Sequence, residues 1–218
     1  MNKRCFKWLG IVLGVVTTIA PLHKARAEGK VLYENNFEKA DLDKVPDDFL
    51  VLDGAFAVKQ EGGNRFLELP GSPLDSYGVL FGPSKASGTS VAARIFGTRK
   101  GRRFPTFGVG VNGVEGFKLQ VSPAKDAVEI YKGDQIVATQ ELKWESGAWY
   151  ILKLQTKAEG AGVRVQAKIW RDKEPEPKDW QLTATDPAAP PAGKASVWGK
   201  PFAGTPIRYD DIKVAEAE

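Results

Sequence analysis

Apolar and polar residues alternate in several stretches of this 218-residue chain, and this period of two limits the folds it can adopt. Successive side chains of a β-strand point to opposite faces, so an alternating stretch predicts a strand with one face buried. No sustained apolar period of 3.6, which would indicate helices, is found. The alternation is clearest in VAARIF (91–96), FKLQV (117–121), AVEIY (127–131), YILKLQT (150–156) and VRVQAKIW (163–170). The sequence therefore predicts an all-β fold.

Residues that favour tight turns separate these predicted strands. Asn112-Gly113 and Gly133-Asp134 are residue types for which a positive φ costs little, as short hairpins require. AEGAG at 158–162 is a third turn signal. We therefore expect an antiparallel meander over residues 106–170. Further along, the Pro-rich 185–193 is expected to be a loop, and PIRYDDIKV the last strand, followed by a short frayed AEAE tail.

The first 27 residues have the features of a secretory signal peptide. Lys3, Arg4 and Lys7 precede a short apolar run, and Ala25-Arg26-Ala27 resembles a cleavage site. The run is shorter than the roughly 20 residues of a membrane-spanning helix, and no later stretch comes closer. We therefore expect a secreted or periplasmic, monomeric protein with no membrane span, divided into a signal peptide (1–27) and one domain (28–218).

Removal of this segment would also remove several reactive residue types. Met1, Cys5 and His23 are the only methionine, cysteine and histidine of the chain. The predicted mature chain therefore lacks the groups that serine-histidine catalysis, cysteine-histidine catalysis and histidine- or cysteine-based zinc sites require. Five of the 31 basic residues belong to the predicted signal peptide, so the predicted mature chain has 26 basic and 27 acidic residues. A generic nucleic-acid-binding protein would keep a basic excess, so we expect no nucleic-acid partner.

The order of several segments resembles a known superfamily. VLYENNF, FLVLDGAFAV, the hairpin series, SGAWYILKLQT, AKIWRDKEPEPKDW and IRYDDIKV together resemble the concanavalin A-like lectin/glucanase superfamily. Within it, the chain is most similar to the laminin G-like jelly rolls of exported bacterial proteins, near the 3-keto-disaccharide hydrolase-like domains. The resemblance implies a two-sheet antiparallel β-sandwich (jelly roll) whose concave face often holds carbohydrate. We therefore expect an exported protein that recognises a polysaccharide or oligosaccharide.

Catalytic motifs of the enzymes in this superfamily are missing. Its retaining glucanases carry a Glu-x-Asp-x-x-Glu strand motif, because their chemistry needs two carboxylates about 5 Å apart. No predicted strand offers such a pair, and Glu129 is the only acid in AVEIYKG. A jelly-roll alginate lyase usually has a histidine in its active site, and the predicted mature chain has no histidine. We expect a binding protein rather than an enzyme. The alternatives are a glycoside hydrolase or polysaccharide lyase with unassigned catalytic residues, and a structural envelope-associated protein.

Alternation also gathers polar side chains on one face of the predicted strands. If these strands share a sheet, that face carries amides and bases that suit sugar hydroxyls, with a tryptophan that can cover a pyranose ring. The alternative is a solvated outer surface, where Lys, Arg and Gln are expected anyway. The candidate ligand-binding residues are Arg94, Lys118, Gln120, Lys153, Gln155, Gln166, Lys168 and Trp170.

The tryptophans after the predicted signal peptide receive different interpretations. Trp170 falls on the polar side of its strand, so we expect it to be accessible at the rim of that face. Trp180 follows a Pro-Glu-Pro turn and is expected to fix its loop. Trp144, Trp149 and Trp198 lie at strand ends or in Gly-bounded segments and are expected to pack in the core or rim.

Two charged segments add further candidates. Arg99, Lys100, Arg102 and Arg103 lie within five residues, which indicates either a site for an anionic polysaccharide or lipid headgroup, or a solvated hairpin tip. The superfamily resemblance implies a structural calcium near the first and last strands, with oxygen ligands from Asp211, Asp210 and Glu34. The alternative is a strand start in which one Asp accepts a hydrogen bond from a neighbouring backbone N–H. No cofactor is otherwise required.

Overall fold

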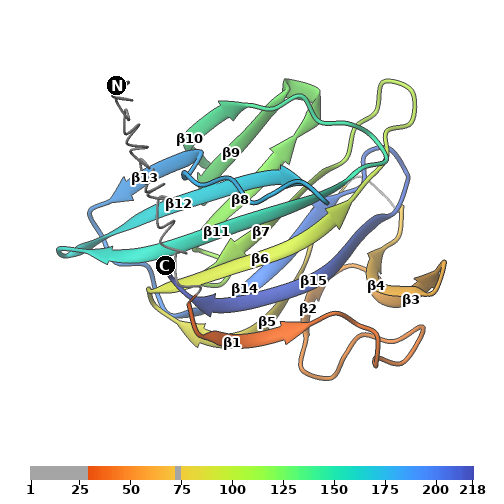
Figure 1. Ribbon diagram of the computed structural model, residues 1–218, viewed down its shortest axis with the longest axis horizontal. Coiled ribbons are helices and arrows are strands. Elements are labelled where there is room, and N and C mark those ends of the chain that lie inside the picture. Colours follow the sequence, from red (N-terminus) through yellow and green to blue (C-terminus); the bar gives the residue numbers. More distant parts are fainter. Residues whose placement is uncertain (1–28, 72–74) are drawn as a thin grey trace, which may run out of the picture.

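The computed structural model describes residues 29–71 and 75–218; the predicted signal peptide lies outside these residues. The described chain forms two antiparallel sheets that pack face to face as a β-sandwich (Figure 1). Its one helical element is a single 3-10 turn, Pro123–Lys125. The prediction of an all-β, two-sheet antiparallel fold is confirmed. Nowhere in the described ranges is there a helix long and apolar enough to cross a membrane.

Sheet A, nearer the viewer in Figure 1, has eight strands, and the last strand of the chain lies in its middle. In spatial order the strands are β13 (Leu182–Asp186), β12 (Gly162–Arg171), β11 (Trp149–Glu159), β6 (Thr89–Phe96), β15 (Ile207–Glu216), β4 (Asn64–Leu69) and β3 (Ala57–Glu61), and β1 (Val31–Asn35) also pairs with β15.

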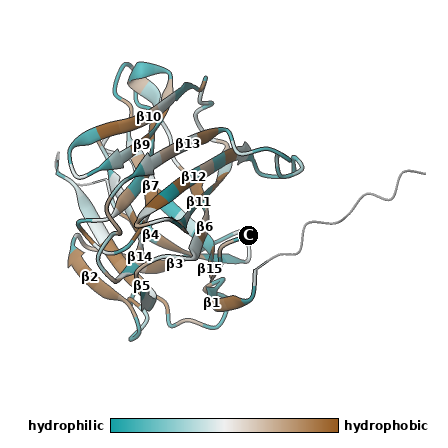
Figure 2. Ribbon diagram, turned by 90° about the vertical axis from the view of Figure 1, so that its left-hand side faces the viewer, coloured by the Kyte–Doolittle hydropathy of each residue, from teal (hydrophilic) through white to brown (hydrophobic). Residues whose placement is uncertain are grey.

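Sheet B has seven strands, in the order β10 (Gln135–Glu141), β9 (Ala127–Lys132), β8 (Phe117–Ser122), β7 (Thr106–Val111), β14 (Gly193–Lys200), β5 (Tyr77–Lys85) and β2 (Leu50–Asp53). Its edge strands β2 and β10 carry apolar side chains that stay exposed, and Figure 2 shows the brown apolar colour on both. These side chains are Leu50, Val51, Leu52, Ile136 and Val137.

The core lies between the sheets and is built by the alternation seen in the sequence. On β12, Val163, Val165, Ala167 and Ile169 are all at most 3% exposed, and the apolar residues of β8 and β11 are buried in the same way. Removing these side chains from water is the main favourable contribution to folding. The predicted inward faces of these strands are confirmed.

The turn signals act at the predicted places. Gly133-Asp134 joins β9 to β10, with Lys132 opposite Gln135 and a positive φ of 55° at Gly133. Gly160-Ala161 joins β11 to β12 in the same way. Asn112 and Gly113 both have positive φ, but the connection from β7 to β8 is longer than a two-residue turn.

The predicted meander over residues 106–170 is only partly correct. Strands β7 to β10 form a meander in sheet B, and the chain then crosses to sheet A, where β11 and β12 form a hairpin. The predicted frayed tail is wrong as well. β15 continues to Glu216, where Ala215 pairs with Ser90, and the backbone N–H of Ala217 donates to Gly88 at 2.9 Å.

Candidate functional site

The predicted ligand-binding residues lie on two opposite surfaces of the sandwich. Lys118 and Gln120 belong to β8 and lie on the outer face of sheet B. The assumption that the polar strands share a sheet is therefore wrong for β8, because alternation specifies the face of a strand but not its partner strands. The other six lie on the outer face of sheet A: Arg94, Lys153, Gln155, Gln166, Lys168 and Trp170.

The outer face of sheet A is covered and internally paired. Glu176, from the loop between β12 and β13, accepts hydrogen bonds from the Nζ atoms of Lys168 (2.8 Å) and Lys153 (3.1 Å). Lys168 is only 2% exposed, and its Nζ lies 4.7 Å from the centre of the Trp180 ring. The alternation of the strands does not indicate this acid, because it comes from a loop rather than from a strand. Trp180 fixes this loop, as expected.

The remaining candidates on sheet A differ in how far they are buried and hydrogen-bonded. Gln155 is fully buried, and its Nε2 donates to Gln166 Oε1 at 3.0 Å. Trp170 is partly exposed and borders a small cavity of about 170 Å³, which Lys153 and Glu176 also line. This face therefore offers less free hydrogen-bonding capacity than its sequence indicates.

Arg94 lies where the calcium implied by the resemblance would bind. Its NH2 is 2.5 Å from an Asp210 carboxylate oxygen, and its Nε is 3.1 Å from Asp211. Asp210 also accepts from Asn64 and, as the alternative reading of this strand expected, from the neighbouring backbone N–H of Asp211. No group of three or more potential metal-ligating side chains occurs in the described parts of the chain. The Arg94 guanidinium already lies between the two aspartates, so Asp210 and Asp211 do not fit a calcium ion. Glu34 and Asp211 nevertheless border the same surface depression.

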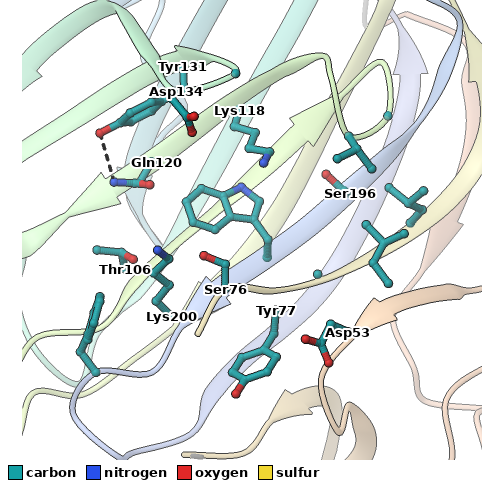
Figure 3. A pocket seen from close by; sticks show the side chains of 18 residues that line it. Asp53, Ser76, Tyr77, Thr106, Lys118, Gln120, Tyr131, Asp134, Ser196 and Lys200 are labelled. Atoms are coloured by element: carbon teal, nitrogen blue, oxygen red, sulfur yellow. Dashed lines mark hydrogen bonds between the residues drawn. The ribbon is translucent and has the colours of Figure 1, made fainter. Parts of the chain in front are cut away.

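A polar-lined hollow with a volume of about 500 Å³ lies on the outer face of sheet B (Figure 3). Lys118 and Gln120 line it, and Tyr77 and Tyr131 stand on opposite sides of it in Figure 3. Hydroxyl, amide and charged groups share the lining: Asp53, Ser76, Tyr77, Thr106, Lys118, Gln120, Tyr131, Asp134, Ser196 and Lys200. This is the mixture of polar groups expected of a site for a small polar ligand.

Trp198 lines this hollow, with glycines on both sides. In the sheet register it faces Gly108 of β7 and Gly78 of β5. A Cβ atom on Gly108 would come within 3.1 Å of the indole ring, and one on Gly110 within 2.4 Å of the Ser196 hydroxyl. Because glycine has no side chain, Gly108 and Gly110 leave room for the Trp198 ring and for the hollow.

Trp198 is largely buried, yet it lies on the outer face of sheet B. It is 9% exposed but stands outside the hydrophobic cluster between the sheets, and the Lys118 ammonium lies 5.7 Å from its ring centre. Its Nε1 has no hydrogen-bond partner among the described residues. Trp198 is packed, as expected of a core or rim residue, and it also lines the hollow. The sequence held the signal, because in KASVWGK the tryptophan alternates with Ala195 and Val197 and so shares the polar side with Ser196 and Lys200.

A buried carboxylate holds one wall of the hollow in place. Glu129 is 3% exposed and accepts hydrogen bonds from Ser122 (2.6 Å), Tyr131 (2.9 Å) and Lys125 (3.0 Å). Gln120 donates to Ser122 at 2.6 Å and to the Tyr131 hydroxyl at 3.5 Å, shown as a dashed line in Figure 3. Burial raises the pKa of Glu129, but these hydrogen bonds outweigh it and hold the pKa below its ordinary value. The ionised carboxylate thus orients Tyr131 and, through Ser122, Gln120.

The carboxylates that line the hollow are far apart. Asp53 is the last residue of β2, at one edge of sheet B, and Asp134 lies in the turn between β9 and β10 near the other edge. Five strand spacings separate β9 from β2, and at about 4.8 Å each they span over 20 Å. Glycosidase carboxylate pairs lie within about 10 Å of each other. These two residues therefore do not form such a pair.

Solved structures share this fold, although the comparisons by sequence found no match. No family model matches the chain, and no curated protein matches it. A Bacillus subtilis protein of unknown function with a galectin-like fold is similar at a TM-score of 0.61 and 13% identity, covering 87% of this chain and 97% of that one. The carbohydrate-binding module CBM66 from Bacillus subtilis gives 0.55 and 15%, over 78% and 96%. The metal-free carbohydrate recognition domain of Emp46p gives 0.57 and 11%, over 88% and 100%. At these identities the likeness establishes the β-sandwich fold.

Proposed function

We propose that this protein is exported to the periplasm or secreted and binds a glycan in the hollow of sheet B. The observation that carries the proposal is the lining of the hollow, in which a tryptophan between glycines is surrounded by amide, hydroxyl and ammonium groups. Sugars present hydroxyls that such groups can bond, together with apolar ring faces that suit aromatic side chains. A volume of about 500 Å³ is within the usual range for small-ligand sites.

Two further observations support the proposal. Gln120 and Tyr131 are already oriented by hydrogen bonds, which reduces the entropy that ligand binding costs. Two of the similarly folded structures are also named for carbohydrate binding or recognition.

A glycan array tests the proposal, with detection of released reducing sugar in parallel. We expect binding without turnover. The double variant Lys118→Ala/Gln120→Ala should lose affinity about tenfold, the effect of about two lost hydrogen bonds, while the melting temperature changes little.

The variants Gln166→Ala and Trp170→Ala on sheet A are the matched controls and should bind like the wild type. If these controls lose affinity and the hollow variant does not, the glycan site is the sheet A face predicted from the sequence. Release of reducing sugar would support the enzyme alternative. Absence of both binding and turnover would favour a structural protein.

A further inference from the structure

The loop between β6 and β7 carries four positive charges that the fold does not use. Arg99, Lys100, Arg102 and Arg103 are exposed, and none forms an ion pair with a residue of the described ranges. Backbone groups hold the loop instead. Lys100 and Arg103 exchange backbone hydrogen bonds of 3.0 and 3.1 Å, and the N–H of Arg99 donates to the Ser146 hydroxyl at 2.9 Å. The four side chains are therefore available to a ligand.

This basic loop, residues 99–103, lies next to one end of the hollow. Thr106, the first residue of β7, is separated from the loop only by Phe104 and Pro105, and it lines the hollow together with Lys200 and Phe202. The Thr205 hydroxyl donates to the carbonyl oxygen of Thr98 at 2.8 Å, which ties the segment after β14 to the start of the loop. Figure 3 shows Thr106 and Lys200 side by side at this end. A chain leaving the hollow there would pass onto the basic loop.

The charges inside the hollow extend the same pattern. Lys118 and Lys200 line it, and no ion pair is found for either within the described chain. The two acids of the lining, Asp53 and Asp134, lie toward opposite edges of sheet B. Lys200 lies opposite Thr106 in the register of β14 and β7 and so stands at the end next to the basic loop, whereas Lys118 lies opposite Gly110, farther along the hollow.

We propose that the glycan is an acidic polysaccharide, carboxylated or sulfated, whose chain occupies the hollow and continues over the basic loop. This inference rests on the proposed function and specifies its ligand class. The positive groups complement the charge of such a polymer, and their exposure makes the attraction sensitive to salt.

Polygalacturonate and its fully methyl-esterified form test the charge requirement, because they differ only in the ionised carboxylate. Alginate, hyaluronan and chondroitin sulfate extend the acidic set, and xylan, galactan and dextran form the neutral set. We expect binding to at least one acidic polymer, and for polygalacturonate the ester should bind more weakly. Raising NaCl from about 50 mM to about 500 mM, which shortens the screening length several-fold, should reduce affinity at least tenfold.

A matched pair of double variants tests the role of the loop. Arg102→Gln/Arg103→Gln should weaken binding to the acidic polymer about fivefold. Lys173→Gln/Lys178→Gln removes the same charge from the exposed loop between β12 and β13 and should bind like the wild type. Equal losses in both variants would overturn the inference, since net charge alone would then explain them.

The panel separates failure of this inference from failure of the proposed function. Binding to neutral glycans only would overturn the acidic ligand and leave the proposed function intact. Binding to no glycan at all would overturn both. Binding to vesicles of anionic phosphatidylglycerol without binding to acidic polysaccharide would assign the basic loop to a lipid surface and overturn the inference.

Discussion

At the scale of single residues, the core contains a polar group without a partner. Tyr209 is fully buried, and its hydroxyl has no hydrogen-bond partner among the described residues. Burial raises the pKa of Tyr209 well above its ordinary value, so the hydroxyl stays neutral. Tyr150 is a natural comparison, because it is also buried, but its hydroxyl accepts the backbone N–H of Glu145 at 3.0 Å.

Tyr209→Phe should therefore raise the free energy of unfolding by about 1 kcal/mol, while Tyr150→Phe should lower it by a similar amount. Urea denaturation of the two variants measures both values. A loss of stability in Tyr209→Phe equal to that in Tyr150→Phe would mean that a buried water or another group pairs with the Tyr209 hydroxyl.

The same scale shows what the sequence reveals about individual side chains. Alternation correctly placed the buried residues of β8, β11 and β12, because burial follows from the two faces of a strand. It also indicated that Trp198, which lies inside β14, shares the polar side of that strand with Ser196 and Lys200. It could not show that Lys168 is 2% exposed, because the covering Glu176 and Trp180 come from a loop without periodicity.

At the scale of elements, the loop between β12 and β13 is held against sheet A by charge. Lys168 is nearly buried, and Glu176, whose side chain is 35% exposed, pairs with it. Burial raises the pKa of Glu176, but hydrogen bonds from Lys168 and Lys153 outweigh it and lower the pKa. Removing only one member of such a pair leaves a buried charge uncompensated, whereas replacing both can be neutral.

Glu176→Gln should accordingly lower the free energy of unfolding by about 1–2 kcal/mol, a value reduced by the partial exposure of the carboxylate. The double variant Lys168→Met/Glu176→Gln should recover most of that loss. Thermal and urea unfolding of the wild type, the single variants Glu176→Gln and Lys168→Met, and the double variant provide the comparison. A double variant as unstable as the sum of its two single variants would show that the pair contributes nothing specific.

The pairing of strands into sheets could not be predicted from the sequence. The strands and their turn residues could be predicted, because each depends on a few neighbouring residues. The assignment of β8 to sheet B and of β11 to sheet A depends on contacts between distant segments, which a period of two does not encode. For this reason the sequence combined Lys118 and Gln120 with side chains that lie on the opposite surface.

At the scale of the whole molecule, the sandwich has two outer faces of different character. The face of sheet A is covered by a loop and paired internally, whereas that of sheet B is open around Trp198 and continues toward the basic loop. This asymmetry, rather than the fold alone, is the basis of the proposed function, because the same fold supports many unrelated activities.

The most direct test of this account follows the indole N–H resonances of the tryptophans by NMR while a glycan selected from the array is titrated. The account predicts that the resonance of Trp198 shifts in proportion to occupancy, while that of Trp170 stays in place. A shift of Trp170 with Trp198 unchanged would move the binding site to sheet A and contradict the account.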